Sequence, residues 1–140
     1  MSKPAPLRLQ MPAKPEYLVL GRLALAGIAR ARPIEAEALS DLKLALTEAC
    51  SNVTRHAYGH GDGVIEIEFE IGDDFVAVEV MDNGIGFEPA RRPGSGGLVE
   101  GGLGLTLIEA LSDATEIGRR RDGTGFRIRF VRRFDPREAR

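Results

Sequence analysis

The chain has 140 residues, 43% of them hydrophobic and 29% charged, and its net charge is −2. This composition is typical of one folded domain with its own core, here residues 1–140, and it excludes a largely disordered chain. No apolar run approaches the roughly 20 residues that cross a bilayer, and the first ten residues lack the apolar stretch of a signal peptide. We therefore expect a cytoplasmic protein without a membrane segment.

Hydrophobic periodicity predicts helices and strands along the whole chain. In chain order we expect a strand over 6–12, helices over 16–32 and 34–57, strands over 64–71 and 75–81, a helix over 103–113, and strands over 115–119 and 125–131. Helical spacing of Leu20, Leu23, Ala24, Gly27 and Ile28 supports the first helix. The second helix holds the single cysteine, Cys50, which we expect to be buried.

The run VIEIEFEI alternates apolar and acidic residues, which is typical of a strand with one face in solvent. The turn GDD then joins it to the run FVAVEVM, so we expect these two strands to be antiparallel neighbours. Together the elements predict an α+β fold, a two-layer α/β sandwich in which about three helices cover a mixed, mostly antiparallel sheet.

Basic residues gather near the end of the chain, where the last 22 residues hold nine arginines and three acids. Such a segment can indicate nucleic-acid binding. However, Arg127 and Arg129 alternate with Phe126, Ile128 and Phe130, as on the solvated face of an amphipathic strand. Because no nucleic-acid motif accompanies the charge, nucleic-acid binding is the weakest functional hypothesis.

Glu48 and Asn52 are four residues apart in the second predicted helix and therefore lie one turn apart on one face. Many such pairs are ordinary surface residues. Oxygen ligands of this kind also suit Mg²⁺, which takes few protein ligands and several phosphate or water oxygens. The spacing therefore leaves a surface pair and a metal site both open.

Glycine-rich segments follow in two further places. The predicted strand 75–81 leads into MDNGIGF, where Asp82 is followed by Gly84 and Gly86. An ordinary turn needs no more than the Asn-Gly pair, so this segment is either a turn or a ligand loop. In GGLVEGGLGL, a helix start carries Gly101, Gly102 and Gly104 and would offer unpaired N–H groups to a phosphate.

In this order, the helical Glu-x-x-x-Asn, the strand-end Asp-x-Gly-x-Gly and the glycine-rich helix start resemble the N, G1 and G2 boxes of the GHKL ATPase superfamily. The likeness is greatest to the bacterial anti-sigma factor serine/threonine kinases and extends from LRLQMPAKPEYL to GTGFRIRF. It implies a histidine-kinase-like ATPase fold that uses ATP and Mg²⁺.

The resemblance also implies a role for each site residue. Asp82 would receive the adenine amino group beside Thr124, and Gly84 and Gly86 would let the backbone close around the nucleotide. Asn52 would hold Mg²⁺ with the nucleotide phosphates, and Glu48 would activate a serine hydroxyl or a water. The implied protein is an anti-sigma factor that sequesters a sigma factor and phosphorylates a STAS-domain anti-sigma factor antagonist. Members of this family commonly form homodimers.

One departure from the family pattern bears on activity. Kinases of the family often have a basic or hydroxyl residue ahead of the last glycines, where this chain has Glu100 and Gly101. A carboxylate there would repel the γ-phosphate, although Arg91 and Arg92 could supply positive charge. The alternative hypothesis is therefore an ATP-binding regulatory module that has no kinase activity and acts by binding partners.

Overall fold

A sheet covered by helices on one face forms the protein. The computed structural model describes residues 6–57, 63–82, 102–119 and 125–138. In these residues the strands are β1 (Leu7–Pro12), β2 (Val64–Ile71), β3 (Phe75–Asp82), β4 (Ala114–Gly118) and β5 (Arg127–Arg133). The helices are α1 (Pro15–Ala31), α2 (Ala36–Ala57) and α4 (Gly102–Leu111), and a 3-10 turn covers Pro136–Glu138.

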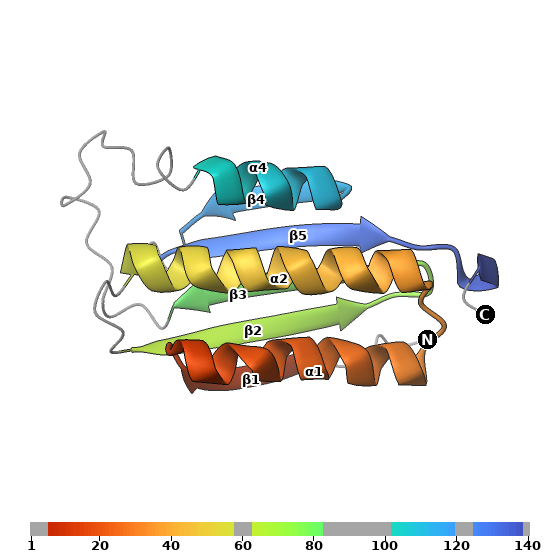
Figure 1. Ribbon diagram of the computed structural model, residues 1–140, viewed down its shortest axis with the longest axis horizontal. Coiled ribbons are helices and arrows are strands. Elements are labelled where there is room, and N and C mark those ends of the chain that lie inside the picture. The colour runs from red at the N-terminus through yellow and green to blue at the C-terminus, as the bar shows by residue number, and fades with distance from the viewer. Residues whose placement is uncertain (1–5, 58–62, 83–101, 120–124, 139–140) are drawn as a thin grey trace.

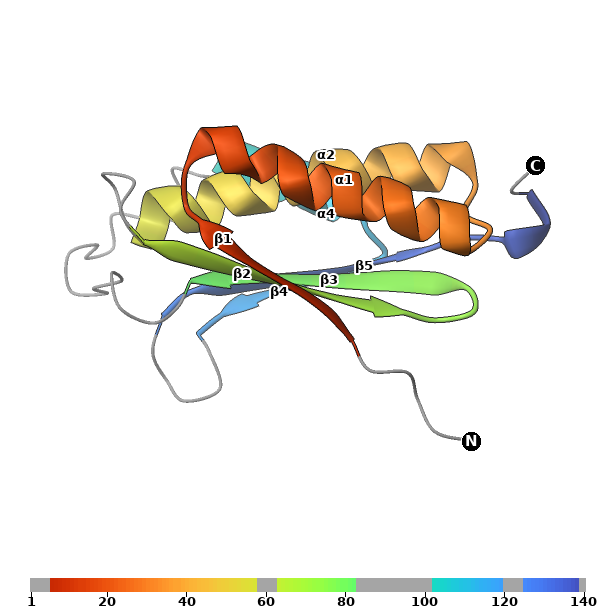
Figure 2. The same cartoon turned by 90° about the horizontal axis from the view of Figure 1, so that it is seen from below.

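The strands pair in the order β1-β2-β3-β5-β4, and each neighbouring pair is antiparallel. All three helices lie on the same side of the sheet (Figure 1, Figure 2). The predicted two-layer sandwich is therefore confirmed. Among the described residues no helix is both long and apolar enough to span a bilayer.

The core lies between α2 and the middle strands. On β2 the apolar residues of the predicted alternation, Ile65, Ile67 and Phe69, are buried on the helix side. They meet the apolar face of α2, where Leu42 and Leu46 have at most 1% of their surface exposed. Each large apolar side chain buried in this way contributes about 1.5 to 3 kcal/mol to stability. This packing fixes the rotation of α2 about its axis, and with it the direction of the polar residues near its end.

Helix α1 meets the core with a side that only partly overlaps the predicted stripe, since Ile28 belongs to both. Its buried residues are Gly21, Leu25 and Ile28, whereas Leu20 and Leu23 are 43% and 60% exposed. Apolar residues form two stripes with helical spacing on different sides of α1. The spacing alone therefore does not show which stripe meets the sheet. An added Cβ on Gly21 would lie only 3.0 Å from a Leu46 methyl group, which shows how closely α1 approaches α2.

Cys50 is buried in α2, as predicted, with 1% of its surface exposed. Burial disfavours the thiolate and raises the pKa of the Cys50 thiol to about 12. The thiol is therefore protonated at neutral pH and acts as a small apolar group in the core.

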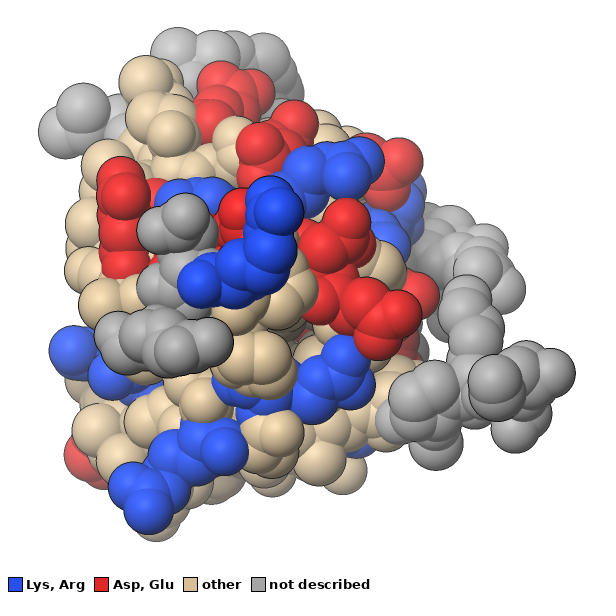
Figure 3. All heavy atoms as spheres, turned by 90° about the vertical axis from the view of Figure 1, so that its right-hand side faces the viewer, with Lys and Arg blue, Asp and Glu red and all other residues tan. Residues whose placement is uncertain are grey.

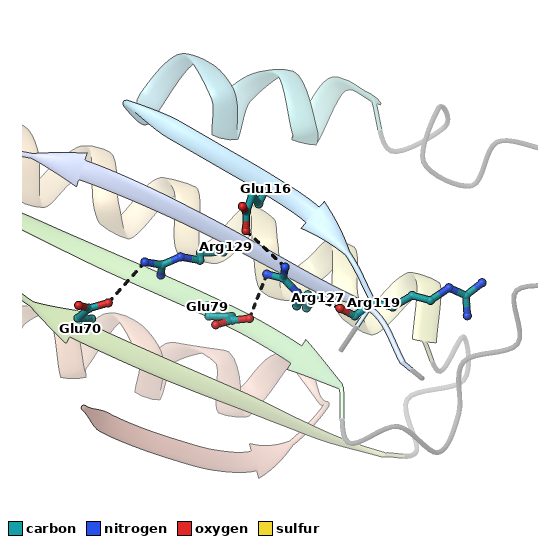
Figure 4. A network of polar contacts seen from close by, with 6 residues as sticks. All are labelled: Glu70, Glu79, Glu116, Arg119, Arg127 and Arg129. Atoms are coloured by element: carbon teal, nitrogen blue, oxygen red, sulfur yellow. Dashed lines mark hydrogen bonds and ion pairs between the residues drawn. The ribbon is translucent and has the colours of Figure 1, made fainter. Parts of the chain in front are cut away.

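On the sheet face that no helix covers, charged side chains of different strands form ion pairs (Figure 4). The Arg127 guanidinium lies 3.1 Å from the Glu79 carboxylate and 3.4 Å from that of Glu116. Arg129 lies 3.4 Å from Glu70. These arginines therefore form the solvated strand face that their alternation predicted, and acids on three other strands offset their charge.

Basic and acidic groups also lie beside one another at the end of the molecule where α1 ends and α2 begins (Figure 3). The ion pairs there are Arg32–Asp73, Arg132–Asp41 and Arg137–Asp135. Hydrogen bonding and proximity to Arg137 lower the pKa of Asp135. Arg132, like Arg127 and Arg129 on the sheet face, is thus paired with an acid from a distant segment, which leaves less net positive charge for a polyanion.

Candidate functional site

Several elements carrying predicted site residues meet at one end of the molecule. Helix α2 and strand β3 both end there, while α4 and β5 both begin there (Figure 1). Antiparallel pairing of β3 with β5 brings the end of the one strand beside the start of the other. At this end Asp82 and Phe126, which are 44 residues apart in the sequence, are joined by a hydrogen bond.

Two polar side chains are buried among the described residues, and both are predicted site residues. Asn52 on α2 and Asp82 at the end of β3 each have 0% of their surface exposed. Burying a carboxylate or an amide costs free energy unless hydrogen bonds compensate. Two such groups at the same end of the fold mark this end as a candidate ligand site.

The rest of the chain compensates only weakly for the free-energy cost of burying the Asn52 amide. Its Nδ2 donates to the Glu48 carbonyl oxygen at 3.5 Å, a long contact. Its Oδ1 is buried and has no hydrogen-bond partner in the part of the chain that the structure describes. An unpaired buried acceptor of this kind costs about 1 to 3 kcal/mol, so the site gains free energy when a ligand pairs with the oxygen.

A hard cation fits this oxygen. The described residues contain no group of three or more His, Cys, Asp or Glu side chains that could enclose a metal. Mg²⁺ does not require one, because it is commonly held by one or two protein oxygens together with phosphates and water. The donor set is therefore compatible with a magnesium ion that arrives with a nucleotide, and this stays a prediction.

Glu48 lies one turn before Asn52 on α2, as the spacing predicted. Its side chain is half-buried, and its carboxylate has no hydrogen bond or ion pair with any residue that the structure describes. A carboxylate without a cationic neighbour is available to accept a proton. Its catalytic role is untested.

Asp82 is held by the start of β5. The backbone N–H of Phe126 donates to Asp82 Oδ2 at 2.7 Å, and the Asp82 N–H donates to the Phe126 carbonyl oxygen at 3.2 Å. A charge-assisted bond of this length offsets part of the cost of burying the carboxylate. The sequence pattern did not identify Phe126 as part of the site, although it identified Thr124, two residues earlier in the same segment.

The glycine-rich helix start lies at the same end. Helix α4 begins at Gly102 and includes Gly104, so these two residues occupy its first turn, where N–H groups lack helical partners. The remaining predicted residues, Gly84, Gly86, Gly101 and Thr124, lie outside the described residues, as do Arg91, Arg92 and Glu100.

Comparison with known proteins places this arrangement in a family. Residues 11–131 match the family described as the histidine kinase-like ATPase domain. The chain is 43% identical over 122 residues to the serine-protein kinase RsbW of Listeria innocua, covering 79% of this chain and 78% of the relative. It is 32% identical over 143 residues to the serine-protein kinase RsbW of Bacillus mycoides, covering 95% and 89% of the two chains.

A solved structure of low sequence identity shares the fold. The chain resembles the RsbU and RsbW domains of Rv1364c from Mycobacterium tuberculosis with a TM-score of 0.68 and 19% identity. The similarity covers 94% of this chain and 33% of that one, so this chain spans about a third of that protein's length.

Proposed function

The chain belongs to the histidine kinase-like ATPase family, and we propose that it is an anti-sigma factor with ATP-dependent protein serine/threonine kinase activity. Its substrate is a serine of a STAS-domain anti-sigma factor antagonist, and it also sequesters a sigma factor, both in the cytoplasm. The observation that carries the proposal is the burial of Asn52 and Asp82 at one end of the fold, with Glu48 one turn from Asn52.

Each residue has a separate task in this reaction. Asp82 accepts a hydrogen bond from the adenine amino group, which distinguishes adenine from guanine because guanine has an acceptor at that position. Glu48 takes the serine proton as the serine oxygen bonds to the γ-phosphorus and ADP leaves. Asn52 holds Mg²⁺, which when bound offsets the negative charge of the phosphates.

The helix start supports the phosphates. Gly102 and Gly104 leave room for the backbone to approach the nucleotide, and the first N–H groups of α4 donate to phosphate oxygens. Gly84, Gly86, Gly101 and Thr124 complete the nucleotide site in this proposal, as the family resemblance implies.

A regulatory module without kinase activity is the second candidate, and Glu100 ahead of the glycines favours it. The two candidate functions differ in whether phosphate is transferred from ATP to a protein substrate. Labelled ATP is to be mixed with the protein and with STAS-domain proteins from the same genome. We expect label on one of them. Binding of ATP and of a sigma factor, with no transfer to any STAS protein, would instead establish the binding module.

Asp82→Asn is expected to weaken ATP binding more than tenfold, because losing one charge-assisted hydrogen bond costs about 1.5 to 3 kcal/mol. Asparagine replaces one carboxylate oxygen with an NH2 group, and this donor would face either the Phe126 N–H or the adenine amine, both of which are donors. Calorimetry with ATP and GTP measures the effect. Equal affinity of the unsubstituted protein for the two nucleotides would contradict the role of Asp82.

We also propose a homodimer through the outer side of α1. This side carries the exposed apolar residues Val19, Leu20 and Leu23. Beside it β1 is the outer strand of the described sheet, and its Leu7 is also exposed. Contiguous exposed apolar residues of this kind are typical of protein interfaces.

Leu23→Glu is expected to convert the dimer to a monomer in analytical ultracentrifugation, because a charge would be buried without a partner. The control is Ala114→Glu, since Ala114 is exposed on β4, the strand at the opposite edge of the described sheet. A monomeric unsubstituted protein, or a Leu23→Glu protein that stays dimeric, would rule out this interface.

A further inference from the structure

The ladder between β3 and β5 ends in an unusual hydrogen bond. In a regular antiparallel pair of the hydrogen-bonded type, two facing residues exchange both backbone bonds. Asp82 donates its N–H to the Phe126 carbonyl oxygen in this manner, at 3.2 Å. The Phe126 N–H, however, donates to the carboxylate oxygen Oδ2 of Asp82 at 2.7 Å. A backbone group of the sheet is therefore used to hold a side chain.

The residue just before this N–H has a backbone conformation that requires glycine. Gly125 is buried and has φ of 68°, in the left-handed region that residues with a Cβ rarely adopt. Phe126, which follows, is buried with 4% of its surface exposed, so the chain has little room to shift at this point. A side chain at position 125 would favour negative φ and change the path by which the chain reaches Phe126.

We propose that Gly125 is a positioning residue for recognition of the base. Its left-handed turn presents the Phe126 N–H to Asp82 Oδ2, and this bond fixes the orientation of the carboxylate toward the 6-amino group of the bound purine. The inference rests on the proposed function, in which Asp82 receives that amino group. It assigns the selectivity for a 6-amino purine to the backbone of β5 as well as to the carboxylate.

The test compares two nucleotides by calorimetry, namely ATP and purine riboside triphosphate, which lacks the 6-amino group. Gly125→Ala is expected to lower the affinity for ATP about tenfold and that for the analogue less than about threefold, because only ATP uses the oriented carboxylate. The matched control is Gly118→Ala in β4, where an added Cβ meets no heavy atom within 4 Å. It is expected to change neither affinity.

A conservative variant separates conformation from side-chain volume. Asparagine tolerates the left-handed region better than other residues with a Cβ, so Gly125→Asn is expected to recover most of the selectivity although it is larger than alanine. Equal losses for both nucleotides in Gly125→Ala, or an unchanged affinity for ATP, would overturn the inference while leaving the kinase proposal intact. An unsubstituted protein that does not prefer ATP to the analogue would overturn both the inference and the proposed role of Asp82.

A second measurement needs no variant of Gly125. Amide hydrogen exchange of Phe126 is expected to become at least about tenfold faster in Asp82→Ala, because its acceptor is removed, while the amides of β2 keep their rates. An unchanged rate at Phe126 would show that the bond to the carboxylate does not hold this segment, and the inference would fail even if Gly125→Ala does not fold.

Discussion

Glu48→Gln is expected to slow phosphate transfer to the protein substrate by roughly 10² to 10⁴-fold, because a positioned general base contributes about that much to rate. Glutamine keeps the length and the helix propensity of the side chain and removes its charge and its ability to take a proton. The affinity for ATP is expected to change little, since in the proposed mechanism the carboxylate acts on the serine hydroxyl. Single-turnover transfer and calorimetry, run on the same preparations, measure the two effects.

Glu109→Gln is the matched control for this substitution, because Glu109 is an exposed glutamate on the neighbouring helix α4. It removes the same charge from the same side of the sheet without approaching the proposed reaction. Transfer at the normal rate is expected. If Glu48→Gln transfers phosphate as fast as Glu109→Gln, Glu48 is an ordinary surface residue and not the base. If, in addition, the unsubstituted protein binds ATP and a sigma factor but transfers phosphate to no partner, the module without kinase activity is the better description.

The layers of the fold could be predicted because each element has one clear period. In β2, apolar residues alternate with glutamates, and the structure places Ile65, Ile67 and Phe69 in the core as the alternation requires. Helix α2 likewise presents a single apolar stripe. Helix α1 presents two, and the sheet accepted Leu25 and Ile28 while leaving Leu20 and Leu23 in solvent. Local periodicity finds such a helix but does not orient it.

The ends of β5 show a second limit of prediction from the sequence. The expected strand, 125–131, is displaced by two residues from the observed Arg127–Arg133. The start is delayed because Gly125 takes up a left-handed conformation and Phe126 directs its N–H to Asp82. Strand propensity contains no information about a carboxylate 44 residues away, so the boundary could not be predicted locally.

The candidate site likewise has one part that sequence motifs indicate and another part that depends on the fold. The sequence singled out Glu48, Asn52 and Asp82 because their motifs are short and their order along the chain is distinctive, and their roles stay predictions. The contact of Phe126 with Asp82 depends on the assembled sheet, which brings the start of β5 beside the end of β3. The burial of Asn52 with an unpaired Oδ1 also depends on the fold. Because such a group lowers stability, a substitution at Asn52 is expected to change ligand binding and stability in opposite directions.

Asn52→Leu is expected to abolish the Mg²⁺ dependence of ATP binding and to lower phosphate transfer at least about a hundredfold, because the proposed metal ligand is removed. The same change is expected to raise the free energy of unfolding without ligand by about 1 kcal/mol, since an apolar group of similar shape replaces an unsatisfied buried oxygen. ATP affinity with Mg²⁺ and with a chelator, and urea unfolding without nucleotide, measure the two effects.

Thr54→Val is the matched control, because Thr54 Oγ1 is the other buried side-chain atom without a hydrogen-bond partner among the described residues. At about 100° of rotation per helical residue, Thr54 lies on the opposite side of α2 from Asn52, so it should not touch the nucleotide. It is expected to stabilise the protein as Asn52→Leu does while leaving transfer unchanged. A protein that Asn52→Leu destabilises, with Mg²⁺ dependence intact, would mean that the amide holds the fold together and does not bind the metal.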